Sequence, residues 1–153
     1  MIRRMLLLAL GAALGIWAAD ASIGTWKLNP AKSAFKPGPP PVAETRVYKS
    51  ERNGVQTTVT TTWADRITTQ VEYPANYDGK DYPVGGSRDV DAVALTRLDD
   101  FTSEAVLKHA GKEIGVARRV VSKDGRTMTI SYKGINTRGD RVDNTAVYDR
   151  QDK

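Results

Sequence analysis

The side chain best suited to bind a ligand is that of Arg118. It alternates along the chain with three aliphatic residues: Ile114, Val116 and Val120. Residues two apart in a strand share a face, so Arg118 would point inward if this face forms the core. A buried guanidinium needs a partner, and a ligand carboxylate would accept paired hydrogen bonds from it. Two other arrangements remain open: the opposite register would place Arg118 on the surface and Arg119 inside, or an internal Asp or Glu pairs with Arg118.

Four aromatic residues could line a pocket beside this arginine, because tyrosine and tryptophan combine an apolar ring with a polar tip. They are Trp63, Tyr73, Tyr132 and Tyr148. Filling of the core is the other explanation for each of them.

Residues suited to catalysis or metal binding are scarce. The chain has no cysteine and a single histidine, His109, beside an expected turn at Ala110-Gly111. A lone histidine cannot form a metal triad, and no hydrolase, zinc-protease, Walker or dinucleotide motif accompanies it. The aspartates in residues 78–91 miss the calcium-loop spacing and suit turns better. We therefore predict no catalytic residue, no metal site, no cofactor and no enzymatic activity.

The elements that must position these residues are strands. Short runs rich in Val, Thr, Ile, Tyr and Trp alternate with turn signals such as Asn53-Gly54 and Asp124-Gly125. These dipeptides supply the positive φ angles of tight hairpins, so neighbouring strands should be antiparallel. No stretch of the sequence shows the 3.6-residue hydrophobic repeat of an amphipathic helix. The predicted strands cover residues 24–29, 44–52, 55–63, 66–75, 80–84, 91–98, 101–109, 112–122, 126–134 and 142–150.

One face of each strand is only partly apolar. Val55, Thr57, Val59, Thr61 and Trp63 share a face, as do the alternate residues Ile67, Thr69, Val71 and Tyr73. A barrel with a cavity tolerates inward polar groups better than a flat sandwich does. Successive hairpins without a long crossover predict an all-β, antiparallel up-and-down barrel of about 8–10 strands, which closure frees from exposed edges.

The first 21 residues have the pattern of a cleavable signal peptide. Arg3-Arg4 precede an apolar stretch over residues 5–18, and Ala19-Asp20-Ala21 is a small-x-small cleavage site. The alternative is a membrane anchor, although the apolar stretch is shorter than the ~20 residues that a span needs. Cleavage after Ala21 would leave residues 22–153 as a single domain in the bacterial periplasm or outside the cell. In that domain, the proline-rich segment 29–42 is expected to be an extended connector or lid.

The net charge of +5 is spread along the chain. Proteins that bind nucleic acid usually cluster their Lys and Arg residues on one patch, because affinity comes from neutralising many phosphates at once. We therefore expect no nucleic-acid partner, no stable membrane insertion of the mature chain, and a monomer.

Both ends of the mature chain resemble the calycins, the superfamily of lipocalins, fatty-acid-binding proteins and avidins. Gly24-Thr25-Trp26 is similar to their G-x-W opening, and residues 111–134 followed by 144–151 are similar to the last three strands of fatty-acid-binding proteins. The resemblance implies that Gly24 lets the chain enter the first strand tightly and that Trp26 packs across the barrel base. The chain also resembles small exported bacterial proteins called lipocalin-like.

The same resemblance implies a ligand site. Arg118 falls where the family has an inward arginine that helps to hold a ligand carboxylate, and Tyr148 falls on the family's terminal-strand tyrosine. The family's second arginine, two residues before that tyrosine, is Ala146 here, and residues 29–42 replace the helical lid.

The sequence therefore predicts an exported β-barrel that binds a small hydrophobic or amphipathic, fatty-acid-like ligand non-covalently in its interior. Arg118 and Tyr148 would lie near the polar group of that ligand. The alternative is a barrel with a filled core that acts through its surface by capturing a partner protein, such as an exported protease. An isomerase built on such a barrel has only the resemblance behind it.

Overall fold

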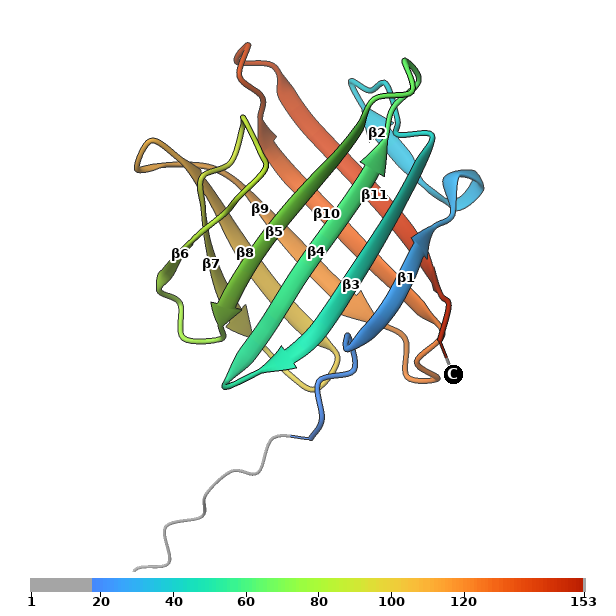
Figure 1. The fold of residues 1–153 in the computed structure, drawn as a ribbon, viewed down its shortest axis with the longest axis vertical. Coiled ribbons are helices and arrows are strands. Elements are labelled where there is room, and N and C mark those ends of the chain that lie inside the picture. Colours follow the sequence, from blue (N-terminus) through green and yellow to red (C-terminus); the bar gives the residue numbers. More distant parts are fainter. Residues whose placement is uncertain (1–17, 153) are drawn as a thin grey trace, which may run out of the picture.

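The computed structural model describes residues 18–152 of the chain. They form an antiparallel, nearly closed barrel of ten strands, which confirms the predicted all-β, up-and-down fold (Figure 1). Most of the predicted signal peptide, residues 1–17, lies outside the described residues. Within residues 18–152 no helix has the length and apolarity that crossing a membrane would take.

All ten predicted strands are present, with ends within two residues of the expected positions. Two short elements were not predicted, a 3₁₀ turn and the strand β2, and both lie in the proline-rich segment 29–42. The elements in chain order are β1 (Gly24–Leu28), η1 (Pro30–Lys32), β2 (Ala34–Lys36), β3 (Ala43–Glu51), β4 (Gly54–Thr62), β5 (Thr68–Asn76), β6 (Asp81–Pro83), β7 (Ala92–Arg97), β8 (Thr102–His109), β9 (Lys112–Val121), β10 (Thr127–Ile135) and β11 (Arg141–Arg150).

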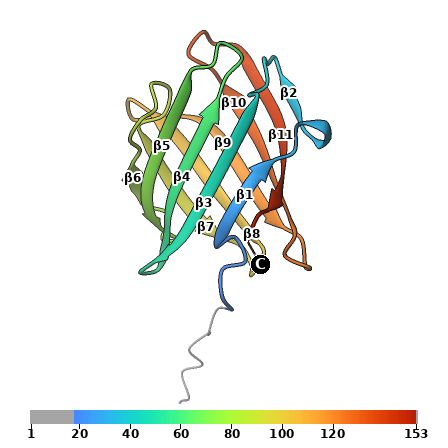
Figure 2. The same cartoon turned by 45° about the vertical axis from the view of Figure 1, so that its right-hand side comes forward.

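The barrel closes where the first strand meets the last. β1 pairs with β11 on one side and with β3 on the other (Figure 2). From β3 to β5 and from β6 to β11, each strand pairs with its neighbour in the chain. The remaining seam lies between β5 and the segment after β6, where Glu72 and Gly85 exchange backbone hydrogen bonds of 3.0 and 2.9 Å. These two bonds pair only part of the backbone along the edge of β5, so the barrel is nearly but not fully closed.

The two ends of the barrel differ. We call one end the floor: it holds residues 18–23, the C-terminal residues 151–152 and the turns that follow β3, β5, β7 and β9. The opposite end, which holds segment 29–42 and the turns that follow β4, β6, β8 and β10, is the mouth. The largest fully buried side chains lie in the half of the barrel nearer the floor: Trp26, Tyr48, Met128 and Tyr148. Several inward side chains nearer the mouth are only half-buried, namely Thr69, Leu107 and Tyr132, so the packing loosens in that direction.

Segment 29–42 is folded onto the barrel wall. β2 pairs with β11, with Phe35 opposite Asn144, and the Phe35 ring packs against the hydrophobic core. The predicted extended connector is thus anchored at its middle by backbone pairing and by one aromatic side chain.

Trp26 seals the floor from inside. Its side chain is 0% exposed, its Nε1 donates a 2.8 Å hydrogen bond to the Ser22 carbonyl, and the Arg150 guanidinium lies 4.2 Å from its ring centre. The predicted burial of Trp26 is confirmed. Gly24, two residues earlier, has a φ of +137°, a backbone conformation that residues with a Cβ rarely adopt, and a Cβ there would also displace the ends of the Arg150 and Asp152 side chains. A glycine is therefore required where the chain enters β1.

We predict that Trp26→Ala lowers the free energy of unfolding by about 3–5 kcal/mol, because it removes a fully buried indole and leaves a cavity. Urea unfolding of the purified protein measures this loss. Trp63→Ala is the matched control, because the Trp63 side chain is 37% exposed, and it should cost much less. Equal stabilities for the two variants would show that the indole does not seal the floor.

Candidate functional site

The inner wall of the barrel carries polar residues at a spacing set by the strands. Alternation along β3 turns Glu44, Arg46 and Tyr48 inward, opposite Thr61, Val59 and Thr57 of β4 in register. Inward arginine and glutamate side chains are costly to desolvate, so they must find partners inside. They do so in two clusters.

The first, which we call the Glu44 cluster, consists of Glu44, Arg46, Thr61 and Tyr148. Arg46 Nε donates to Glu44 Oε1 at 2.7 Å and to the Tyr148 hydroxyl at 3.0 Å. The Tyr148 hydroxyl donates to the same Glu44 oxygen at 2.6 Å, and Thr61 Oγ1 donates to the other at 2.9 Å. Both carboxylate oxygens of Glu44 are therefore held, and the Arg46 guanidinium is fixed at its Nε end.

Arg46 remains accessible to water although it points into the barrel. Its side chain is 22% exposed, whereas the residues that flank it in register, Trp26 on β1 and Val59 on β4, are 0% and 8% exposed. An inward side chain between buried neighbours can gain this exposure only from inside the barrel. Part of the Arg46 side chain is therefore in contact with unfilled space on the inner side of the wall.

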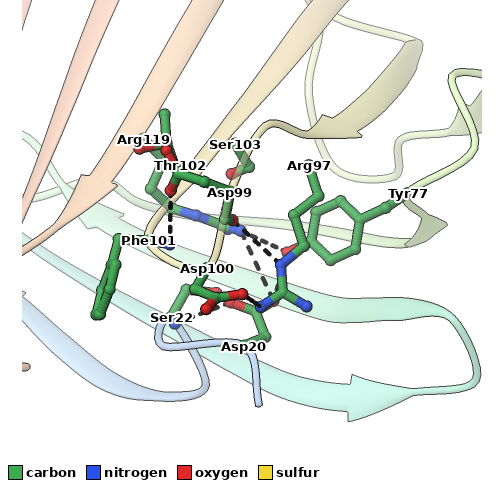
Figure 3. Close-up of a pocket in the computed structure, with 10 residues that line it drawn as sticks. All are labelled: Asp20, Ser22, Tyr77, Arg97, Asp99, Asp100, Phe101, Thr102, Ser103 and Arg119. Carbon is green, nitrogen blue, oxygen red and sulfur yellow. Dashed lines mark hydrogen bonds and ion pairs between the residues drawn. The ribbon is translucent and has the colours of Figure 1, made fainter. Parts of the chain in front are cut away.

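The second cluster, which we call the floor cluster, consists of Asp20, Ser22, Tyr77 and Arg119 (Figure 3). Arg119 Nη2 donates to the Tyr77 hydroxyl at 2.6 Å, and that hydroxyl donates to Asp20 Oδ2 at 2.5 Å. Ser22 donates to Asp20 Oδ1 through its backbone N–H at 2.9 Å and its hydroxyl at 2.7 Å. The hollow among these residues has a volume of about 10 Å³, room for roughly one water molecule. This hollow thus has no room for anything larger.

Tyr48 lies between the two clusters. The Arg119 guanidinium stacks 4.5 Å from the centre of the Tyr48 ring. Burial raises the pKa of the Tyr48 hydroxyl, but the positive charges of Arg46 and Arg119 lower it by more, so its pKa is below the ordinary value. The hydroxyl is thus close to both cations and links them electrostatically.

The two buried carboxyl groups are ionised in the folded protein. Burial raises the pKa of Glu44, but the Arg46 charge and the hydrogen bonds from Tyr148, Arg46 and Thr61 together bring it below its ordinary value of 4.5. Burial likewise raises the pKa of Asp20, and Arg119, Tyr77 and Ser22 together lower it below 3.8. Each cluster therefore holds one carboxylate against one guanidinium.

The predicted inward orientation of Arg118 is wrong. Its side chain is 55% exposed on the outer face of β9 and pairs with Glu104 on β8 at 3.2 Å. Arg119 faces the interior instead, which is the opposite register that the sequence left open. The inner face of β9 also carries Gly115, where a Cβ would collide with the Tyr132 ring. Small residues occupy the inner face to admit that ring, so the aliphatic residues that suggested a core face are on the outside.

The other predicted site residues separate into two groups. Tyr148 lies inside, in the Glu44 cluster, and Tyr73 and Tyr132 also face the interior. Trp63 lies at the mouth beyond the end of β4, so the structure does not bring it to the interior clusters. Glu44 and Arg46 were missed by the sequence analysis, although their alternation with Tyr48 in the segment "ETRVY" is a signal that could have identified them.

The comparisons with known proteins give no family assignment. No protein-family model matches the chain, and no curated protein matches its sequence. Within residues 18–152, no group of three or more His, Cys, Asp or Glu side chains is placed to hold a metal ion. The functional argument therefore depends on the geometry of the interior.

We predict that acid destabilises the protein through Glu44. Its pKa is lower in the folded than in the unfolded state, so its stabilisation is present above pH 4.5 and is lost as the pH falls through the lowered folded value. Glu44→Gln should reduce the dependence of the unfolding free energy on pH in this acidic range, measured by urea unfolding across the range.

Glu104→Gln is the control, because Glu104 lies on the outer face of β8 beside Arg118. It should leave the acid dependence nearly unchanged. An equally steep loss of stability in Glu44→Gln and in the unmodified protein would rule out Glu44 as the source.

Proposed function

We propose that this protein binds a small amphipathic molecule with an anionic head group, non-covalently, inside the barrel. The observation that carries the proposal is Arg46 on the inner wall, whose side chain is 22% exposed between buried neighbours. A ligand carboxylate or sulfonate that reached it would exchange hydration for charge-assisted hydrogen bonds in a sheltered site.

Arg46 has hydrogen-bond donors left for such a ligand. A guanidinium carries five N–H donors, and both bonds to the Glu44 cluster use Nε. The Tyr48 hydroxyl is a further hydrogen-bonding neighbour of Arg46, and a single hydroxyl cannot occupy all four remaining N–H donors. Because Nε is held by Glu44 and Tyr148, the guanidinium is already oriented before a ligand arrives, which lowers the entropy lost on binding.

The wall toward the mouth suits the apolar part of such a molecule. Leu107 and Tyr132 face inward there and are only half-buried. Covering them with an alkyl chain or an aromatic ring would remove apolar surface from water, at about 25 cal/mol per Å². The ligand would thus lie with its head group near Arg46 and its apolar part toward the mouth.

Export fits the same proposal. The leader pattern over residues 1–21 supports a periplasmic or secreted location. A single-domain barrel without cysteine needs no disulfide chemistry in such a compartment.

The filled half of the barrel near the floor favours a second candidate, in which the protein acts through its surface by capturing a partner protein. The two candidates differ in one property, which is saturable binding of a small molecule by the purified protein.

We predict saturable binding of dodecanoate, measured by displacement of 1-anilinonaphthalene-8-sulfonate fluorescence. Arg46→Gln should weaken binding roughly 10- to 100-fold, because a hydrogen bond to a charged group contributes about 1.5–3 kcal/mol. Arg118→Gln is the matched control, since it removes an arginine from the outer face, and its Kd should be unchanged.

Circular dichroism would confirm that both variants are folded. Absence of saturable binding, or equal losses in the two variants, would reject the interior site and leave surface capture as the better candidate.

A further inference from the structure

The N-terminal residues 18–23 are part of the folded barrel. We propose that the leader is cut on the N-terminal side of Asp20, between Ala18 and Ala19, so that Asp20 stays in the mature protein as the counter-charge of Arg119. This inference rests on the proposed export. It differs from the cleavage after Ala21 that the small-x-small pattern predicts.

The Asp20 side chain is largely buried and hydrogen-bonded, as the polar side chains of a protein core are. Its side chain is only 18% exposed, and it accepts the hydrogen bonds from Ser22 and Tyr77 that were described for the floor cluster. Those contacts join the leader end of the chain to Tyr77, which follows β5, and the Tyr77 hydroxyl joins it in turn to Arg119 of β9 (Figure 3).

The neighbouring backbone is held too. The Ala21 carbonyl accepts a 2.7 Å hydrogen bond from Arg150 Nη2, and the Ala18 carbonyl accepts one of 2.8 Å from Arg97 Nη2. Arg150 also stacks on Trp26. Removal of Ala21 would therefore take one acceptor from the arginine that covers the floor indole.

A cut after Ala21 would leave the charge of Arg119 without its carboxylate. In residues 18–152, Asp20 is the only carboxylate within 4.0 Å of the Arg119 guanidinium. The side chain of Arg119 is 11% exposed, and its other close contacts, with Tyr48 and Tyr77, are to neutral groups. Breaking a buried ion pair by removing one partner is strongly destabilising, because the remaining charge stays desolvated.

The same cut would add a second positive charge at this place. Ser22 would become the first residue, and its backbone nitrogen, now 2.9 Å from Asp20 Oδ1, would become an ammonium group. An α-amino group has an ordinary pKa of about 7.7–8.0, so it is largely charged at neutral pH. Ser22 lines the same hollow as Arg119, so this charge would stand near the guanidinium. Two cations would then face the space that one carboxylate had filled.

Residues around the proposed cut are compatible with processing there. Ala18 would be the small residue before the cut, and Ala18 and Ala19 are both exposed, so the bond between them lies at the surface of the folded barrel. The third residue before the proposed cut is Ile16, which is larger than the pattern prefers, but a cut one residue later would place the still bulkier Trp17 there.

The test is expression of the full 153-residue chain in a bacterium with a periplasm, followed by intact-mass measurement of the purified protein. We expect a first residue of Ala19. A first residue of Ser22 would overturn this inference and leave the proposed export standing. A full-length mass in the cytoplasmic fraction would reject export and this inference with it.

A second variant tests the role of Asp20 by stability. Asp20→Asn in the full chain should lower the melting temperature of the exported protein, whereas Asp143→Asn, at an exposed position of β11, should not. Identical melting temperatures for Asp20→Asn and the unmodified protein would contradict the proposal, as expected if residue 20 had been cut away.

Discussion

The compensation of two inward guanidinium groups is the constraint on which the rest of this structure depends. Arg46 and Arg119 point into a small barrel, where an unpaired charge would be prohibitively costly. Glu44 and Asp20 supply one carboxylate each, and tyrosine hydroxyls complete the hydrogen bonds. The interior therefore has a polar axis, with Tyr48 between its two charged pairs.

The topology makes this axis possible. Pairing of β1 with β11 places Trp26 opposite Arg150 and Leu28 opposite Tyr148, so both ends of the chain contribute to one sealed half of the barrel. The two charged pairs then differ in surroundings. Arg119 is 11% exposed at the floor among its own carboxylate and aromatic neighbours, whereas the Arg46 side chain on the inner wall is 22% exposed. This asymmetry is why we propose ligand binding at Arg46 and a structural role for Arg119.

The strands were located correctly from the sequence, but the wrong inward face was predicted for β9. Turn pairs such as Asn53-Gly54 and Asp124-Gly125 mark hairpins locally, so the ten strands could be placed within two residues. The face of β9 was misjudged because hydrophobicity is a poor guide where a large ring needs room. The Tyr132 ring requires Gly115 on the inner face, and this leaves Ile114, Val116 and Val120 outside with Arg118. The role of Asp20 was hidden for another reason, since its partners Tyr77 and Arg119 are distant in the sequence and only the closed barrel brings them together.

The most direct test of the central claim is a nitrogen-15 NMR titration of the arginine Nε–H resonances with dodecanoate. Each such resonance reports on one guanidinium, so the spectrum distinguishes the inner wall from the outer face. The account predicts a saturable shift of the Arg46 resonance with no change at Arg118. Movement of surface arginine resonances alone, or no saturable shift at Arg46, would contradict it.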